Sequence, residues 1–342
     1  MPRVTVLVPV FNAAPFVRAA LDSVLAQDFA DFELLVLDDA STDGSAGVVA
    51  GVHDTRLRLV PGDRNMGVAS VLNRGLDLAT GEFVARMDAD DLCRRDRLGR
   101  QVEFLDRHSA IAGGGSSVKL FGAITGTWRA PCSPSAVRAF MLFGNPVCHP
   151  SVMLRREWLQ RRGLRYDPAC TRSEDFDLWW RVLEAGDMDN HPDCLLALRM
   201  HANSVRARHG TDMREQTASI VGRSLTRLGI ETTPAELAFH VAVGSGDRME
   251  SRSDICRAQA WLQGLVRANE TRQAFDRAAL LGVVGGVWER LCMNSAPLGT
   301  WVWRKCRESG WPCRGTGRDR TRFAASIAWH AVTGRFRRAG AV

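Results

Sequence analysis

The chain is poor in lysine and has no paired cysteine pattern. Lys119 and Lys305 are the only lysines among 45 basic residues, a bias that we attribute to genomic composition and not to function. Nine cysteines are scattered along the chain, and no two have the Cys-x-x-Cys spacing. An odd, unpaired set argues against a zinc ribbon or a disulfide framework and favours a reducing compartment.

Long apolar segments are also missing. The longest apolar run, at 278–288, is too short to cross a bilayer. No basic-then-apolar segment opens the chain, as it would in a secretory signal. We therefore expect a cytoplasmic protein, peripheral at most to the inner face of the plasma membrane.

Positive charge is concentrated at one end of the chain. The net charge is +7, and residues 301–342 hold ten basic residues against two acids, so residues 1–300 sum to −1. Four indoles are interleaved with this charge: Trp301, Trp303, Trp311 and Trp329. Such a tail suits an anionic membrane surface. The alternative is a packed helical tail with solvated arginines. No nucleic-acid-binding module accompanies the charge, so no nucleic acid partner is expected.

Strands and helices alternate in the first third of the chain. Apolar runs and helical spacing predict strands at 4–10, 33–37, 56–60 and 82–87 and helices at 15–26, 66–79 and 96–107. This order predicts an α/β fold with a Rossmann-like, mostly parallel sheet flanked by helices. Weaker strands are expected at 110–121 and 126–130, and helices at 134–143, 155–162 and 175–185. We expect a domain at 1–210 and a mainly helical C-terminal region at 211–342.

Polar side chains follow three of the predicted strands. Asn12 follows the first strand, Asp38-Asp39 ends the second, and Asp88, Asp90 and Asp91 follow the fourth. In parallel sheets the ligand lies beyond the carboxyl ends of the strands. Three clusters that are distant in sequence therefore converge on one edge, where a carboxylate such as Asp39 can accept the imide N–H of a uracil.

The acidic run at 88–91 predicts a metal site. Its three carboxylates repel one another unless a cation lies between them, and Mg²⁺ or Mn²⁺ takes oxygen ligands and commonly holds a diphosphate. The alternative is a solvated loop whose Asp residues cap a helix.

A second acidic cluster lies at 173–181. Ser173 can cap a helix whose first turn then carries acids, but a cap does not explain three acids beside Trp179 and Trp180. Indoles are flat platforms for sugar rings, and a neighbouring carboxylate can act as a general base. Both indoles cannot point the same way on one helix, so at least one belongs to the core. A lone histidine such as His149 is more often structural than functional, and His201 can approach a metal or phosphate.

These motifs together resemble those of family-2 glycosyltransferases of the GT-A fold, over about residues 1–205. The matching segments, in the family's order, are 8–12, 36–45, 65–67, 88–91, 149–151, 173–179 and 199–201. Phe11 stands where tyrosine is frequent in the family. Leu72-Asn73 stands where Arg-Asn is frequent, so no role is assigned there.

The resemblance implies an inverting transferase that uses a nucleotide-diphosphate-sugar donor, preferably a UDP-sugar, with Mg²⁺ or Mn²⁺. It implies a saccharide or lipid-linked acceptor in cell-surface polysaccharide or glycolipid synthesis. It implies Asp175 as the catalytic base with Glu174 beside it, and Trp179 and His149 on the acceptor side. The implied donor residues are Pro9, Phe11, Asn12, Asp39, Asn65 and Asp88, and the implied metal residues are Asp90, Asp88, Asp91 and His201.

Two other classes of protein remain open. A sugar nucleotidyltransferase also uses clustered Asp and Mg²⁺, but it should carry a phosphate loop rich in Gly, Lys or Arg near the first strand, which residues 9–15 lack. A catalytically silent scaffold with the same fold is the second class. Intact Asp88, Asp90 and Asp175 speak against it.

Overall fold

The computed structural model describes residues 1–201 and 211–312, and the chain divides into two units. Among the described residues, the first unit comprises 1–138, 145–201 and 211–217, and the second comprises 139–144 and 218–312. The boundary at 217/218 lies seven residues beyond the expected one, inside a helix. The short segment 139–144 belongs to the second unit although the residues on either side of it belong to the first.

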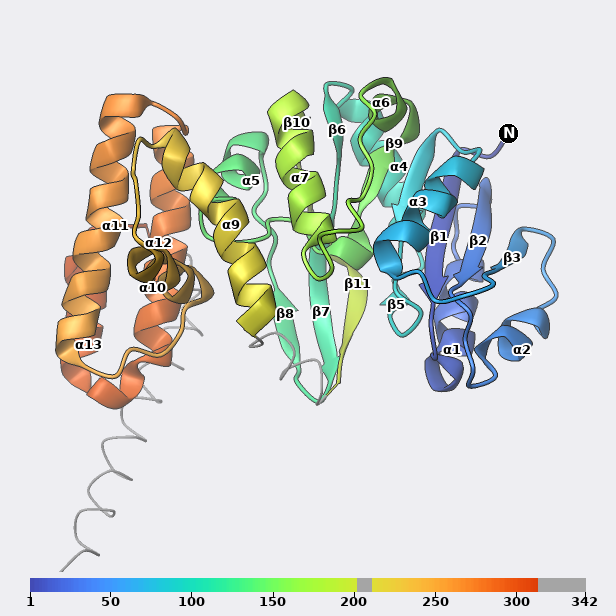
Figure 1. Ribbon diagram of the computed structural model, residues 1–342, viewed down its shortest axis with the longest axis horizontal. Coiled ribbons are helices and arrows are strands. Elements are labelled where there is room, and N and C mark those ends of the chain that lie inside the picture. Colours follow the sequence, from blue (N-terminus) through green and yellow to red (C-terminus); the bar gives the residue numbers. More distant parts are fainter. Residues whose placement is uncertain (202–210, 313–342) are drawn as a thin grey trace, which may run out of the picture. The chain divides into compact units, whose positions relative to one another are not determined.

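A seven-stranded sheet forms the centre of the first unit (Figure 1). Its parallel half has the order β3-β2-β1-β4, and the antiparallel β9 separates it from the parallel pair β6 and β10. The strand bounds are β1 (Val4–Val10), β2 (Phe32–Asp38), β3 (Leu57–Pro61), β4 (Phe83–Arg86), β6 (Ile111–Gly114), β9 (Met153–Arg155) and β10 (Asp187–Met188). The predicted mostly parallel sheet is confirmed. Strand β9 was not expected; it lies at the start of the helix predicted at 155–162 and just before it.

A second, four-stranded sheet has the order β5-β11-β7-β8. Its strands are β5 (Leu92–Cys93), β7 (Ser116–Gly122), β8 (Gly126–Trp128) and β11 (His191–Met200). β5 begins one residue after the acidic run at 88–91, and β11 ends one residue before His201. Because β5 and β11 pair antiparallel, this sheet brings the two segments together.

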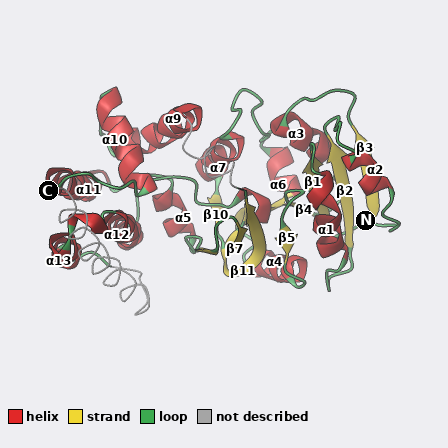
Figure 2. Ribbon diagram, turned by 90° about the horizontal axis from the view of Figure 1, so that it is seen from below, coloured by secondary structure: helices red, strands yellow, loops and turns green. Residues whose placement is uncertain are grey.

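Helices cover both faces of the central sheet (Figure 2). Val4, Val6, Val8 and Val10 of β1 pack on one face in a core that includes Val17 and Leu21. On the other face, Gly75 lets a helix approach closely, since a Cβ there would lie 2.6 Å from Leu37. The helices are α1 (Ala14–Leu25), α2 (Ser45–Ala50), α3 (Val68–Leu78), α4 (Arg97–Arg107), α5 (Pro134–Phe140), α6 (Arg156–Arg161) and α7 (Glu174–Ala185), with a 3-10 turn, η1 (His149–Ser151). Buried Val and Leu side chains contribute about 1.5–3 kcal/mol each to this core.

The second unit is helical in its described part. Its elements are α9 (Thr211–Arg227, which begins in the first unit), α10 (Pro234–Ser245), α11 (Arg252–Arg272), α12 (Arg277–Asn294), η2 (Ala296–Leu298) and α13 (Thr300–Glu308). Capping boxes at Thr233 and Ser251 fix the starts of α10 and α11. Ala139, Leu142 and Phe143 are part of the core of this unit.

The indoles expected in a membrane-facing tail divide into two groups. Trp301, Trp303 and Trp311 pack against the core of the helical unit, and the Trp311 ring lies 5.7 Å from the Trp288 ring. Trp329 and the basic residues from Arg314 onward lie outside the described residues. Membrane contact by the tail therefore stays a prediction. Within residues 1–201 and 211–312, none of the helices combines the length and the apolar character that spanning a bilayer requires.

Candidate active site

A cavity of about 310 Å³ opens at the carboxyl ends of the parallel strands. Its lining includes seven of the predicted site residues: Pro9, Phe11, Asn12, Asp39, Asp88, Asp90 and His201. The apolar Phe16, Val68 and Val71 also line it. Phe11 is 50% exposed, which is unusual for a large apolar side chain in this protein. The expected convergence of strand ends is confirmed. Asn65 is exposed and does not line the cavity, so its donor role stays a prediction.

Asp39 connects the cavity to the start of α3. Its two carboxylate oxygens accept the backbone N–H groups of Met66 at 2.8 Å and Gly67 at 2.9 Å. Gly67 has φ of +80°, a conformation that L side chains rarely adopt. Each carboxylate oxygen can accept a second hydrogen bond, so Asp39 can hold α3 and still accept an N–H from a ligand.

Asn12 joins the ends of β1 and β2. Its Oδ1 accepts the N–H of Thr42 at 2.8 Å, and its own N–H donates to Ser41 Oγ at 3.0 Å. Asp43 accepts the N–H of Ala14 at 2.9 Å. The exposed Asn12 therefore holds the loop that shapes the rim of the cavity.

Each carboxylate of the acidic run has a different partner. Asp88 receives two hydrogen bonds from the buried Arg86, at 2.9 and 2.5 Å. Asp90 Oδ2 lies 2.7 Å from His201 Nε2. Asp91 is fully buried and its Oδ1 accepts the N–H of Arg199 at 2.7 Å. Burial, reinforced by Asp88, raises the pKa of Asp91 to about 8.

These three carboxylates suit a hard divalent cation. One oxygen from each of Asp88, Asp90 and Asp91 lies within 4.8 Å of the other two. Asp91 Oδ2 is buried and has no hydrogen-bond partner among the described residues, an arrangement that a cation would satisfy. Carboxylate oxygens are the ligands that Mg²⁺ and Mn²⁺ prefer. Asp91 does not line the cavity, so Asp88 and Asp90 are the acids that a ligand would meet.

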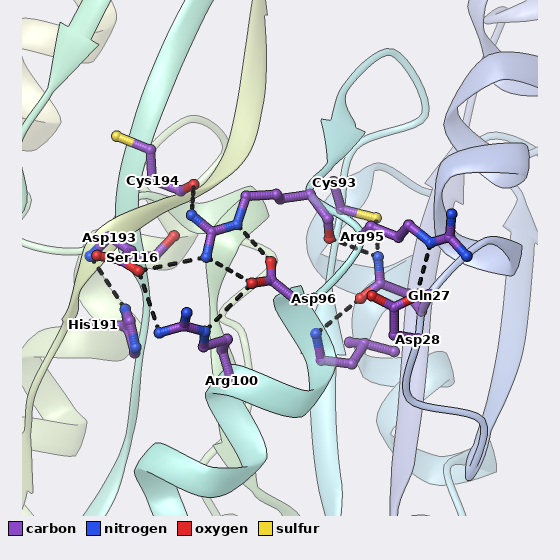
Figure 3. Close-up of polar contacts among 12 residues, drawn as sticks. Gln27, Asp28, Cys93, Arg95, Asp96, Arg100, Ser116, His191, Asp193 and Cys194 are labelled. Atoms are coloured by element: carbon purple, nitrogen blue, oxygen red, sulfur yellow. Dashed lines mark hydrogen bonds and ion pairs between the residues drawn. The ribbon is translucent and has the colours of Figure 1, made fainter.

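A polar network holds the chain that follows the acidic run (Figure 3). Asp96 accepts hydrogen bonds from Arg94 at 2.5 and 2.9 Å and pairs with Arg100, and both arginines also reach Asp193. The exposed pairs contribute little singly. The buried Gln27 adds bonds to the Arg94 carbonyl at 2.7 Å and from the N–H of Leu98 at 2.9 Å. Together they fix β5 against β11 and α1.

Glu174 and Asp175 begin α7 and form a second, buried acidic site. Asp175 Oδ1 accepts the N–H of Phe176 at 2.8 Å, and Oδ2 accepts from Asn145 Nδ2 at 2.7 Å. His149 Nδ1 lies 3.9 Å from Glu174 Oε1 and 4.0 Å from Asp175 Oδ2. Burial, followed by the charge of Asp175, raises the pKa of Glu174 to about 7, and burial also raises the pKa of Asp175.

His149 is held by a chain of contacts from α3. Its Nε2 lies 3.0 Å from the Tyr166 hydroxyl, and the backbone N–H and carbonyl of Tyr166 bond to the side-chain amide of Asn73 at 3.0 and 2.8 Å. Burial lowers the pKa of His149 well below its usual value. A neutral imidazole whose Nε2 accepts a hydrogen bond from the Tyr166 hydroxyl would direct Nδ1–H toward the two carboxylates.

The expected acceptor role of Trp179 is wrong. Its side chain is fully buried and its ring lies 5.9 Å from that of His149, so it has no face on which a sugar could stack. Trp180 is only 9% exposed and is also part of the core. Helix α7 turns these indoles inward while its first turn holds Glu174 and Asp175.

Four residues of this region have roles that the motifs did not reveal: Arg86, Asn73, Asn145 and Tyr166. Arg86 bonds to Asp88, and its charge partly opposes the rise that burial causes in the pKa of Asp175. It is therefore the cation that both acidic sites share. None of these residues has a role assigned by a motif of its own segment. Each has its role because the fold brings it close to a partner elsewhere in the sequence.

Solved structures with similar folds are transferases. The chain superposes on residues 1–349 of S. aureus TarS in complex with UDP-GlcNAc with a TM-score of 0.56 and 18% identity, covering 90% of this chain and 89% of that one. It superposes on the mannosyltransferase PcManGT from Pyrobaculum calidifontis, in complex with GDP-Man and Mn²⁺, with a TM-score of 0.52 and 22% identity, covering 96% and 87%. The fold is that of the GT-A-type transferases.

The sequence relatives identify the family. The model of glycosyl transferase family 2 matches residues 5–163. EpsE of Bacillus subtilis, which is named as a glycosyltransferase, is 33% identical over 191 residues, 54% of this chain and 68% of EpsE. The succinoglycan biosynthesis protein ExoO of Rhizobium meliloti is 31% identical over 199 residues, 54% of this chain and 57% of ExoO. The chain belongs to glycosyltransferase family 2.

Proposed function

We propose that this chain is an inverting, metal-dependent glycosyltransferase that moves a sugar from a nucleoside-diphosphate donor to an acceptor hydroxyl. The observation that carries the proposal is the cavity at the strand ends, whose lining includes both Phe11 and Asp39 and the acids Asp88 and Asp90. An exposed ring suits a nucleobase, and clustered acids suit a metal-bound diphosphate.

The donor binds with its base between Phe11 and Asp39, and with its diphosphate toward Asp90 and Asp88. Mg²⁺ or Mn²⁺, held by these two acids with Asp91 and His201 adjoining, would supply positive charge against the departing diphosphate. UDP-sugars are the preferred donors because a carboxylate at Asp39 suits an imide N–H. The solved neighbours hold UDP-GlcNAc and GDP-Man, so the test includes both bases.

Asp175 is the general base of the transfer. Its carboxylate takes the proton of the acceptor hydroxyl while that oxygen forms a bond to the anomeric carbon. The bond from this carbon to the diphosphate breaks on the opposite face, which inverts the configuration. Asp175 suits this role because two hydrogen bonds orient its carboxylate and because burial raises its pKa, which makes it a stronger base than an exposed aspartate.

The acceptor is a saccharide or a lipid-linked saccharide. ExoO, which matches over more than half of this chain, is named for succinoglycan biosynthesis, and this supports a role in making a cell-surface polysaccharide or glycolipid. The scattered cysteines support a reducing, cytoplasmic site of action. His149 is buried and lies 4.0 Å from the Asp175 carboxylate, so its acceptor-side role is to shape the site.

Calorimetric titration with UDP and with GDP, each with and without Mn²⁺, tests the donor site. We expect tight binding of one nucleotide only when Mn²⁺ is present, and loss of this metal-dependent gain in Asp90→Ala, because the variant lacks a charged oxygen ligand. The same pattern should appear as slow metal-dependent hydrolysis of the matching nucleotide-sugar. A nucleotide affinity that changes neither with Mn²⁺ nor in Asp90→Ala would overturn the proposal. Formation of a nucleoside triphosphate and a sugar 1-phosphate from the nucleotide-sugar and added pyrophosphate would favour a nucleotidyltransferase instead.

A further inference from the structure

Asp175 has two hydrogen-bond donors of different kinds. The N–H of Phe176 reaches Oδ1 at 2.8 Å and belongs to the same helical turn, so any residue but proline could supply it. Asn145 Nδ2 reaches Oδ2 at 2.7 Å from 30 residues away. Among the described residues, Asn145 is the only one whose side chain donates a hydrogen bond to this carboxylate.

Asn145 is itself held in one orientation. Its Oδ1 accepts the N–H of Val147 at 3.1 Å, which assigns the amide so that Nδ2 faces Asp175. The carbonyl of the adjoining Pro146 accepts from Asn190 Nδ2 at 3.0 Å. Asn190 is 1% exposed, and its Oδ1 accepts the N–H of Gly115 at 2.8 Å. The amide therefore has its position before any acceptor binds.

The charges around Asp175 make this hydrogen bond matter. Glu174 on α7 and Tyr166 in the segment before α7 lie close enough for their charges to couple to Asp175, and His149 on η1 lies 4.0 Å away. Arg86 on β4 is the cation whose charge reaches Asp175. Burial and the neighbouring acid oppose ionisation, while Arg86 and the two hydrogen bonds favour it.

We propose that Asn145 is the positioning residue of the catalytic base: it fixes the rotation of the Asp175 carboxylate and keeps it ionised, and so sets the pH at which sugar transfer begins. This inference rests on the proposed function. It adds to that function a residue outside the donor cavity, since Asn145 is absent from the cavity lining.

The test is the pH profile of kcat and of the donor KM for the full chain and for Asn145→Ala, from about pH 5 to about pH 9. Loss of a hydrogen bond to a charged oxygen should raise the pKa of the base, so we expect the acid limb of kcat to move upward by about one pH unit. Below that limb kcat should fall about tenfold, and above it most activity should return. The donor KM should stay unchanged.

Asn145→Asp keeps the size of the side chain and places another carboxylate against Asp175. We expect its acid limb to lie above that of Asn145→Ala, because like charges disfavour ionisation. This variant decides the question alone if Asn145→Ala does not fold. Asn294→Ala is the matched control: its amide donates to the Gly246 carbonyl at 2.6 Å in the helical unit, and its profile should match the parent.

An acid limb that stays in place in both Asn145 variants, or a kcat that falls equally at every pH, would overturn the inference and leave Asn145 a structural residue. Asp175→Asn separates this failure from a wrong function. An inactive Asp175→Asn beside unshifted Asn145 profiles refutes only the inference, whereas a fully active Asp175→Asn refutes the assigned base itself.

Discussion

The two acidic sites of the first unit differ in their access to solvent. Asp88 and Asp90 line an open cavity and have cationic or imidazole partners, Arg86 and His201. Glu174 and Asp175 lie beneath the surface, and burial raises the pKa of both. The first site suits the cation and the ligand that we propose for it. The second is arranged to hold or take a proton, because its own charge is costly there.

The largest effect is expected from removing the proton acceptor. Asp175→Asn should lower kcat at least about 100-fold, because general-base help is typically worth that much, while nucleotide affinity is retained. Assays of nucleoside diphosphate release with donor and acceptor measure kcat, and calorimetry of donor binding measures the affinity. Asp106→Asn, which loses only an exposed pair with Arg3, should be near normal. Near-normal turnover in Asp175→Asn would contradict the assignment of the second acidic site as the one that accepts the proton.

Stability should respond to pH through the buried site. The pKa of Glu174 is raised from 4.5 to about 7, so the folded state holds a proton that the unfolded state releases between these values. Stability from this group is therefore present at low pH and lost as the pH rises through about 7, by on the order of 3 kcal/mol.

Glu174→Gln should accordingly melt at a higher temperature than the parent at pH 8 and at a similar temperature near pH 5. Thermal melts at both pH values measure the difference. Glu157→Gln, on exposed α6, should show no such pH dependence. Equal effects of the two changes would mean that Glu174 is as well hydrated as a surface acid.

The smallest effect is expected at the open rim. Phe11→Ala should weaken nucleotide binding about tenfold, because stacking of a base on an aromatic ring is worth roughly 1–3 kcal/mol. Phe11→Trp should retain the affinity, and calorimetry with the bare nucleotide diphosphate checks both. An unaltered nucleotide affinity in Phe11→Ala would show that the base does not stack on this ring. The proposed contact of the base with Asp39 would then also lose its support.

The sequence predicted the parts of this protein that depend on local pattern. The runs of β1, β2 and β4 and the helical spacing of α1 and α4 gave these elements to within about two residues. The rule that ligands lie beyond parallel strand ends then brought Asp39 and the acidic run to one cavity.

What the sequence did not predict depends on contacts between distant segments. Asn73 and Tyr166 are 93 residues apart, and no periodicity links an amide on α3 to the histidine near the base. Trp179 was misplaced because composition does not tell which way a helix faces once both sides of it are covered. The antiparallel β9 is only three residues long, too short for a pattern.

The segment 139–144 has a consequence for dividing the protein. Ala139, Leu142 and Phe143 are counted in the core of the helical unit, and the Leu142 carbonyl accepts from His240 at 2.6 Å. Truncation of the chain after residue 217 would therefore remove the residues that bury these three apolar side chains and expose them to solvent. Exchange of the helical unit at a single boundary near residue 217 would therefore leave part of its core behind in the first unit.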